Sequence, residues 1–229
     1  MAADPGPDEP SLSDPVGRAP ILQCRQMDPR AARRTFLAAA MRRPTTVGAV
    51  APSSARLAGV LASVVPSEGS PIIVELGPGT GSVSAAIDRR LPVGARHLAI
   101  ELDADMVEYL RRTRPTLEVV WGDARHLSGL LAEHGVTRVD AVVSGLPWAL
   151  FDAPTQAAIL REVTRLIGPT GAFTTFAYLH GMPLTSARRF RHTLREIFDE
   201  VVVGTTIWRN LPPAFGYICR RPARVPVSG

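Results

Sequence analysis

Three acidic residues stand at the ends of successive apolar runs in this sequence, and their spacing is the first indication of chemistry. Glu75 lies two residues before a glycine-rich turn, Gly77-Pro78-Gly79-Thr80-Gly81, which closes one apolar run and opens a helical pattern. Glu101 ends the second run and Asp123 follows the third. Each acid alone is explained as a cap of the next helix. Three acids at three strand ends, the first joined to a glycine turn, favour a ligand-binding site.

The chemistry of these residues distinguishes two classes of ligand. The dinucleotide fingerprint G-x-G-x-x-G would place a third glycine where this sequence has Ser82. A pyrophosphate gains nothing from the carboxylate of Glu75, whereas an ammonium or a sulfonium gains by charge attraction or through ordered water. Glu101 can accept hydrogen bonds from both hydroxyls of a ribose, and Asp123 can accept one from an adenine amino group. These residues predict S-adenosyl-L-methionine as the cofactor, with a nicotinamide or nucleotide enzyme as the alternative.

The elements that must position these residues alternate along the chain. Short apolar runs separated by helical patterns are typical of a parallel sheet covered on both faces. The last two runs are joined by a short loop and predict an antiparallel hairpin. The expected strands are 71–77, 97–103, 117–123, 139–145, 171–178, 201–208 and 214–219. This order resembles the Rossmann-like α/β fold of class I methyltransferases: a mostly parallel seven-stranded sheet with an antiparallel C-terminal hairpin strand and helices on both faces.

The length of 229 residues suits one domain. The first 27 residues are acidic and proline-rich and lack the features of a secretory signal, so we expect a disordered tail and a cytoplasmic protein. A helix and connector are expected over 28–54, the methyltransferase domain over 55–221, and a C-terminal tail over 222–229. No apolar run reaches the roughly 18 residues of a membrane span. Cys24 and Cys219 are expected to be reduced thiols, and no metal site is expected.

The chain carries a net charge of +5, and all 26 of its basic residues are arginines. Much alanine, proline and glycine accompanies them, as in GC-rich coding, which explains arginine in place of lysine but not the excess of positive charge. That excess is compatible with an anionic partner, either nucleic acid or a membrane surface.

Four segments occur in the order in which they occur in bacterial phospholipid N-methyltransferases, and the sequence resembles this family from about Phe36 to Arg221. They are G-A-V-A-P-S-S (48–54), E-L-G-P-G-T-G (75–81), S-G-L-P (144–147) and N-L-P-P-A-F (210–215). The resemblance implies that the acceptor is the amine of phosphatidylethanolamine and of its partly methylated forms. It also implies a phospholipid substrate and a peripheral location on the inner face of the cell membrane, with the N-terminal helix lying on the bilayer.

The predicted cofactor-binding residues all lie at strand ends. They are Glu75, Gly77, Gly79, Gly81, Glu101, Asp123, Ala124, Ser144, Gly145 and Leu146. The predicted catalytic residues are Trp148, Tyr178 and His180. Trp148 has two interpretations, a large apolar core residue or a cation–π partner of the amine or the sulfonium. Tyr178, His180 or water could take the proton that an ammonium must lose before it can attack, although His180 is equally explained as a surface residue.

Two other acceptors are weighed against the lipid amine. The related rRNA adenine N6-methyltransferases place Asn or Asp before a Pro-aromatic pair, so that its oxygen can hold a base amino group. Here Pro147 and Trp148 keep the pair, but Ser144 and Gly145 offer neither amide nor carboxylate, so nucleic acid is not expected as a partner. A soluble small molecule remains the alternative acceptor. A binding module without catalysis is disfavoured by the three acids.

The expected helix at 28–43 carries the basis for membrane binding. Its five arginines, at 30, 33, 34, 42 and 43, accompany Phe36, Leu37 and Met41. Basic residues near an anionic bilayer each contribute about 1 kcal/mol, and arginine stems can lie along apolar surface. The segment is not cleanly amphipathic, however, and a helix packed on the domain through its alanines is the alternative.

Overall fold

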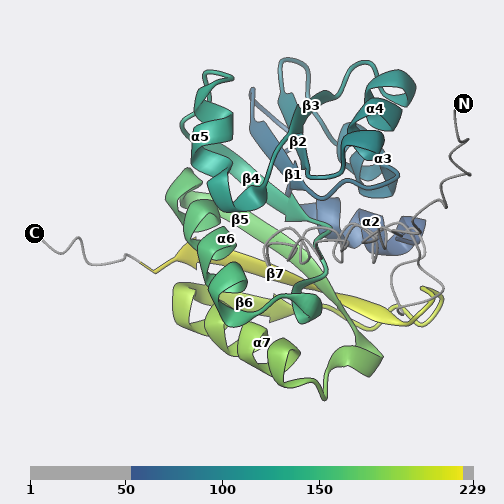
Figure 1. Cartoon of the computed structure of the whole chain (residues 1–229), viewed down its shortest axis with the longest axis vertical. Coiled ribbons are helices and arrows are strands. Elements are labelled where there is room, and N and C mark those ends of the chain that lie inside the picture. Colours follow the sequence, from purple (N-terminus) through teal and green to yellow (C-terminus); the bar gives the residue numbers. More distant parts are fainter. Residues whose placement is uncertain (1–52, 224–229) are drawn as a thin grey trace, which may run out of the picture.

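The computed structural model describes residues 53–223, which form a single seven-stranded sheet with helices on both faces (Figure 1). The strand order is β3-β2-β1-β4-β5-β7-β6. The strands are β1 Ile72–Leu76, β2 Arg96–Glu101, β3 Glu118–Trp121, β4 Val139–Ser144, β5 Ile167–Tyr178, β6 Phe198–Val203 and β7 Ala214–Pro222. Strands β1 to β5 are parallel, and β7 pairs antiparallel with both β5 and β6. The predicted fold is therefore confirmed.

One helix precedes the first strand, and each of the others connects two consecutive strands along the chain. The helices are α2 Ala55–Leu61, α3 Ser82–Asp88, α4 Ala104–Thr113, α5 Leu127–Ala132, α6 Ala153–Leu166 and α7 Thr185–Ile197. Short 3-10 turns follow several strand ends: η2 Ala124–His126, η3 Trp148–Leu150 and η4 Leu179–Gly181, with η1 Ala62–Val64 extending α2. Side-chain caps fix where helices begin. Ser54 accepts from the Leu57 amide at 3.3 Å to start α2, and Asp152 accepts from the Thr155 amide at 3.1 Å to start α6.

The strand order reverses between β1 and β4, which are neighbours in the middle of the sheet. In open α/β sheets, ligands bind outside the carboxyl ends of the strands at such a reversal. Each of the first five strands ends at this edge of the sheet. The segments 77–81, 144–147 and 178–180, which lie at the ends of β1, β4 and β5, are therefore at the same edge. The fold thus gathers the predicted site residues at one edge.

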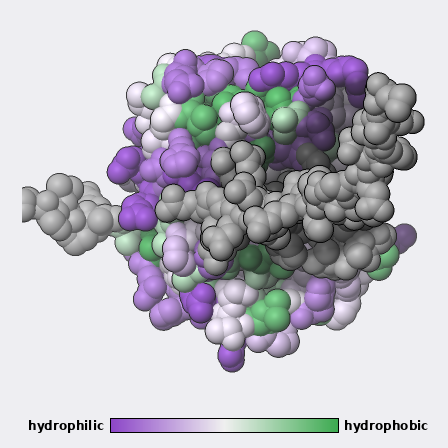
Figure 2. Space-filling model, viewed as in Figure 1, coloured by the Kyte–Doolittle hydropathy of each residue, from purple (hydrophilic) through white to green (hydrophobic). Residues whose placement is uncertain are grey.

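The core lies on both faces of the sheet because alternate side chains of the central strands point in opposite directions. Val74 and Leu76 of β1 belong to the larger cluster, under α5, α6 and α7. Ile73 belongs to a second cluster, packed with α2 and α3. Hydrophilic residues cover much of the described part of the face seen in Figure 2, with hydrophobic residues in small groups between them.

Three elements differ from the sequence prediction. Strand β5 begins at Ile167 rather than at 171, and β6 spans Phe198–Val203 rather than 201–208. Helix α5 was not predicted, because a six-residue segment containing Gly129 has little helical preference of its own. Leu127 and Leu131, one turn apart, are fully buried against the core and stabilise it. The predicted tail at 1–27, the helix at 28–43 and residues 224–229 of the predicted C-terminal tail (222–229) lie outside the described residues, whereas Pro222 of that tail belongs to β7.

Candidate cofactor and acceptor site

The glycine turn after β1 lies against the end of β4. The Gly145 amide donates to the Leu76 carbonyl at 2.8 Å, and the Gly77 amide donates to the Ile100 carbonyl at 3.0 Å. A Cβ atom on Gly145 would lie only 2.6 Å from the carbonyl oxygen of Gly77, which is backbone and cannot move aside. Glycine at 145 therefore allows two strand ends to touch.

Gly79 at the tip of the turn has the opposite surroundings. Its φ is +53°, and a Cβ atom built there would have no neighbour within 4 Å. A glycine in this conformation lets a ligand approach the backbone without hindrance from a side chain. The space beside Gly79 is thus suited to the amino-acid part of the predicted cofactor, whereas Gly77 and Gly81 face the Leu146 and Arg114 side chains.

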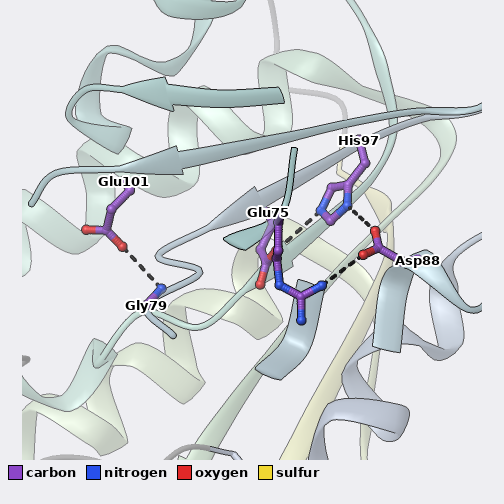
Figure 3. A network of polar contacts seen from close by, with 6 residues as sticks. Glu75, Gly79, Asp88, His97 and Glu101 are labelled. Atoms are coloured by element: carbon purple, nitrogen blue, oxygen red, sulfur yellow. Dashed lines mark hydrogen bonds and ion pairs between the residues drawn. The ribbon is translucent and has the colours of Figure 1, made fainter. Parts of the chain in front are cut away.

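Glu101 connects the end of β2 to this turn and is 1% exposed. Its Oε2 accepts from the Gly79 amide at 3.2 Å (Figure 3), and its Oε1 accepts from the Leu102 and Asp103 amides at 2.8 and 3.0 Å. Burial raises the pKa of Glu101, and the three backbone hydrogen bonds offset part of that rise. A carboxylate has about four acceptor sites, so Glu101 shapes the turn and still has acceptor capacity for a ribose hydroxyl.

Glu75 is fully buried and takes part in a polar network inside the protein (Figure 3). Its Oε2 lies 3.3 Å from Nε2 of His97, and Nδ1 of that ring lies 3.1 Å from Oδ1 of Asp88. Arg114 continues the network with a 3.1 Å contact to the other oxygen of Asp88. Burial opposes the charge on His97, but its hydrogen bond with Asp88 and its attraction to the Glu75 carboxylate outweigh this and raise its pKa. The histidine can therefore neutralise Glu75 beneath the glycine turn, a partner that the sequence analysis missed.

Asp123 serves as a cap, which was the simpler explanation for it. It accepts from the Arg125 amide at 2.9 Å and starts η2, whose first residue is Ala124. The Arg125 guanidinium also donates to Asp123, at 3.0 Å from Nε and 2.6 Å from Nη2. Although burial opposes ionisation, this pairing lowers the pKa of Asp123. Asp123 is thus held as a carboxylate beside the end of β3, with Arg125 as its partner.

Trp148 lies in the core beneath the site. It is 2% exposed, its ring stacks on that of Phe190 with centroids 4.5 Å apart, and it meets the Phe173 and Phe151 rings edge-on. Its indole nitrogen donates to Ser144 Oγ at 3.1 Å. A ring enclosed in this way presents no face to an amine, so its surroundings favour the core interpretation over cation–π contact. Its hydrogen bond instead fixes the turn that carries Gly145 and Leu146.

Tyr178 and His180 follow β5 and stack on each other, with ring centroids 5.6 Å apart. Tyr178 is half-buried, and burial raises its pKa to about 12. A phenol with this pKa stays protonated at neutral pH and can orient an amine by hydrogen bonding, but it is a poor proton acceptor. His180 is exposed, which leaves it and water as the candidates for that role.

A buried asparagine that the sequence analysis used only as part of a motif joins two distant segments. Asn210 is 2% exposed; its Oδ1 accepts from the Ser54 amide at 3.0 Å, and its Nδ2 donates to the Pro212 carbonyl at 2.7 Å. Ser54, the last residue of the G-A-V-A-P-S-S segment, therefore contacts the N-L-P-P-A-F segment. Their separation along the chain hides this contact from sequence inspection.

Two kinds of feature are absent from residues 53–223. No group of three or more His, Cys, Asp or Glu side chains there is placed to hold a metal ion. Over the same residues, no helix has both the length and the apolar character that crossing a bilayer requires.

Comparison with known proteins gives concordant matches. Residues 73–171 match a family described as a methyltransferase domain. An ornithine lipid N-methyltransferase from Singulisphaera acidiphila is 35% identical over 190 residues, which cover 81% of this chain and 94% of the relative.

Solved structures share the fold at low identity. A predicted O-methyltransferase from Agrobacterium tumefaciens superposes with a TM-score of 0.55 at 18% identity, covering 73% of this chain and 81% of that one. Fibrillarin from Aeropyrum pernix, solved with S-adenosyl-L-methionine, gives 0.52 at 16% identity and covers 71% of this chain and 74% of its own.

Proposed function

The chain belongs to the class I S-adenosyl-L-methionine-dependent methyltransferases, within the bacterial phospholipid N-methyltransferase family, and from this premise we propose that it methylates the amine of a membrane-lipid head group. Its cofactor is S-adenosyl-L-methionine, which supplies an electrophilic methyl group on a sulfonium. Ornithine lipid and phosphatidylethanolamine both present a suitable primary amine. The 35% identity to an ornithine lipid N-methyltransferase supports this class of acceptor.

The surroundings of Ser144 are the observation in the structure that carries the proposal. Together with Gly145, which has no side chain, Ser144 stands where related base methyltransferases need an amide or carboxylate to hold a planar amino group. Here its hydroxyl is fully buried and already accepts hydrogen bonds from Trp148 and from the Leu146 amide, the latter at 3.3 Å. No polar clamp for a nucleobase is available at this position. An aliphatic amine, which attacks through a tetrahedral lone pair, needs none.

The residues of the chain act mainly by positioning. Glu101 and the Gly77–Gly81 turn would hold the cofactor. Glu101 can accept a hydrogen bond from a ribose hydroxyl, and the turn leaves open space beside Gly79. Holding the amine in line with the methyl group supplies most of the acceleration, through the entropy of bringing both reactants together. Tyr178, protonated at neutral pH, would orient the amine. Water or His180 would take its proton.

We place the reaction at a membrane surface on the cytoplasmic side. The net charge of +5 supports contact with anionic lipids. The arginines between 30 and 43 would contribute to this contact, so binding is expected to weaken as salt rises.

The test is a labelled-methyl assay over a panel of acceptors. The full-length chain is incubated with labelled cofactor and vesicles containing ornithine lipid, phosphatidylethanolamine or its monomethyl form, and in parallel with ornithine, ethanolamine and rRNA. We expect label in the lipid extract, with the better head group identified by rate. Label confined to the soluble amines or to RNA would overturn the proposal.

A further inference from the structure

The loop between β6 and β7, residues 204–213, exposes two large apolar side chains. Trp208 is 70% exposed and Leu211 is 79% exposed. Figure 1 shows this connection, in yellow, projecting beyond the sheet on the right of the view. Side chains of this size normally have apolar surface buried, so their exposure on one short loop requires a reason.

The loop is held in this shape at its base. The Ile207 amide donates to the Ala214 carbonyl at 2.7 Å, and both residues are buried. Between the exposed pair, Asn210 is buried and bonded to Ser54 and Pro212 at 3.0 and 2.7 Å. The backbone is therefore fixed from inside, and the same fixing directs Trp208 and Leu211 away from the domain.

The loop adjoins the candidate acceptor residues. The Leu179 amide donates to the Pro213 carbonyl at 2.9 Å, and Tyr178 pairs with Ala214 across β5 and β7. Most other exposed large hydrophobic side chains of the described residues also follow or precede this edge of the sheet. Those at or next to the edge are Trp121, Leu150, Leu179, Leu184, Val202, Val203, Trp208 and Leu211; Val93 lies elsewhere.

We infer that the 204–213 loop is a membrane-contact surface that inserts Trp208 and Leu211 into the head-group region of a bilayer containing anionic lipids. Tryptophan prefers this region because its ring is apolar and its N–H is polar. Arg209, exposed between the two apolar residues, and the net charge of +5 complement an anionic surface. The inference rests on the proposed function in one respect: a lipid acceptor must reach Tyr178 and His180 from the bilayer, and the loop stands beside them.

The experiment compares full-length variants in binding to sonicated vesicles of phosphatidylcholine with and without phosphatidylglycerol. The Trp208→Ala/Leu211→Ala double variant is tested against Val93→Ala, which removes an even more exposed apolar side chain (99% exposed) from the loop before β2, at the opposite edge of the sheet. From the apolar area removed, we expect the double variant to lose at least about tenfold in vesicle partitioning. Val93→Ala should bind like the parent, and Trp208→Phe should retain most of the binding. Tryptophan emission should shift to the blue on vesicle binding in the parent and not in Trp208→Phe.

Three results would overturn the inference. The double variant, with an unchanged thermal midpoint, could partition like the parent, which would place the membrane contact elsewhere. It could alter the oligomeric mass without lipid and leave partitioning unchanged, which would make the loop an interface between copies. It could lose methylation of detergent-dispersed aminolipid as strongly as of vesicle lipid, which would assign the loop to the acceptor site. Failure of the parent to methylate any lipid would refute the proposed function, while the vesicle comparison would still decide the role of the loop.

Discussion

Replacing Glu101 by glutamine tests the cofactor site at the residue that connects the end of β2 to the glycine turn. Glutamine keeps one oxygen, which can still accept from the Leu102 and Asp103 amides. Its NH2 group would face the Gly79 amide, where Glu101 Oε2 now accepts at 3.2 Å, so that two donors would oppose each other. The charge that a ribose hydroxyl would use is lost as well.

The magnitude follows from these contacts. A hydrogen bond to a charged group contributes about 1.5 to 3 kcal/mol, which corresponds to roughly 10- to 150-fold in the dissociation constant for each bond to the ligand. We expect Glu101→Gln to weaken S-adenosyl-L-methionine binding at least tenfold, from an affinity in the micromolar range. The free energy of unfolding should fall too, because the partly buried Gly79 amide loses its acceptor.

The pH dependence supplies an independent check on the same group. Burial raises the pKa of Glu101 above its ordinary value of 4.5. Cofactor binding by the parent should therefore weaken as the pH falls toward that raised value, since the protonated acid accepts fewer hydrogen bonds. Glu101→Gln cannot titrate there, and its weak binding should depend less on pH.

The assay is isothermal titration calorimetry with the full chain, with the thermal midpoint as the measure of folding. The matched control is Glu118→Gln, which makes the same exchange on neighbouring β3 but disturbs only a partly exposed pair with Arg96 at 2.7 Å. Parent-like affinity in Glu101→Gln would remove Glu101 from the cofactor site. An equal loss in Glu118→Gln would show that the effect is one of general stability.

Three further predictions concern other parts of the chain. Gly79→Val should fold and fail to bind the cofactor in calorimetry, whereas Gly145→Val should not fold, because its side chain would meet the Gly77 carbonyl; binding by Gly79→Val would mean that the turn is misassigned. The charge on His97, whose pKa is raised above 6.5, stabilises the fold below pH 6.5 and is lost as the pH rises through the raised value. Urea unfolding should therefore show a decline over that range that His97→Gln lacks, and parallel profiles would contradict it. Deletion of residues 1–43 should reduce co-sedimentation with phosphatidylglycerol vesicles at low salt, and undiminished binding would limit the contact to the domain.

Much of the fold could be predicted from the sequence because its signals are local. The runs ending at Glu101 and Ser144 are apolar over the length of a strand and are bounded by helical patterns, so they identify buried parallel strands directly. The lack of a helical pattern between the last two apolar runs likewise identified the hairpin, although the connection, residues 204–213, is longer than expected because β6 ends at Val203. Helix α5 was missed because its stability comes from the burial of Leu127 and Leu131 rather than from intrinsic preference.

The contacts within the site could not be predicted in the same way, because they depend on register and on distant elements. His97 reaches Glu75 only because β1 and β2 pair with Ile73 opposite His97. Trp148 is enclosed by Phe190, which belongs to α7 and lies far along the chain. The sequence could place residues at strand ends, whereas tertiary packing decided which side chains face one another.

The most direct test of lipid-amine methylation is to locate the transferred methyl group. The full-length chain is incubated with S-adenosyl-L-methionine carrying a deuterated methyl group and vesicles that contain both ornithine lipid and phosphatidylethanolamine, and the extracted lipids are analysed by tandem mass spectrometry. The account predicts deuterated methyl on the head-group nitrogen of at least one of the two lipids, and strongly reduced transfer by Glu101→Gln. Cofactor binding by the parent with no deuterium on any lipid nitrogen would contradict it.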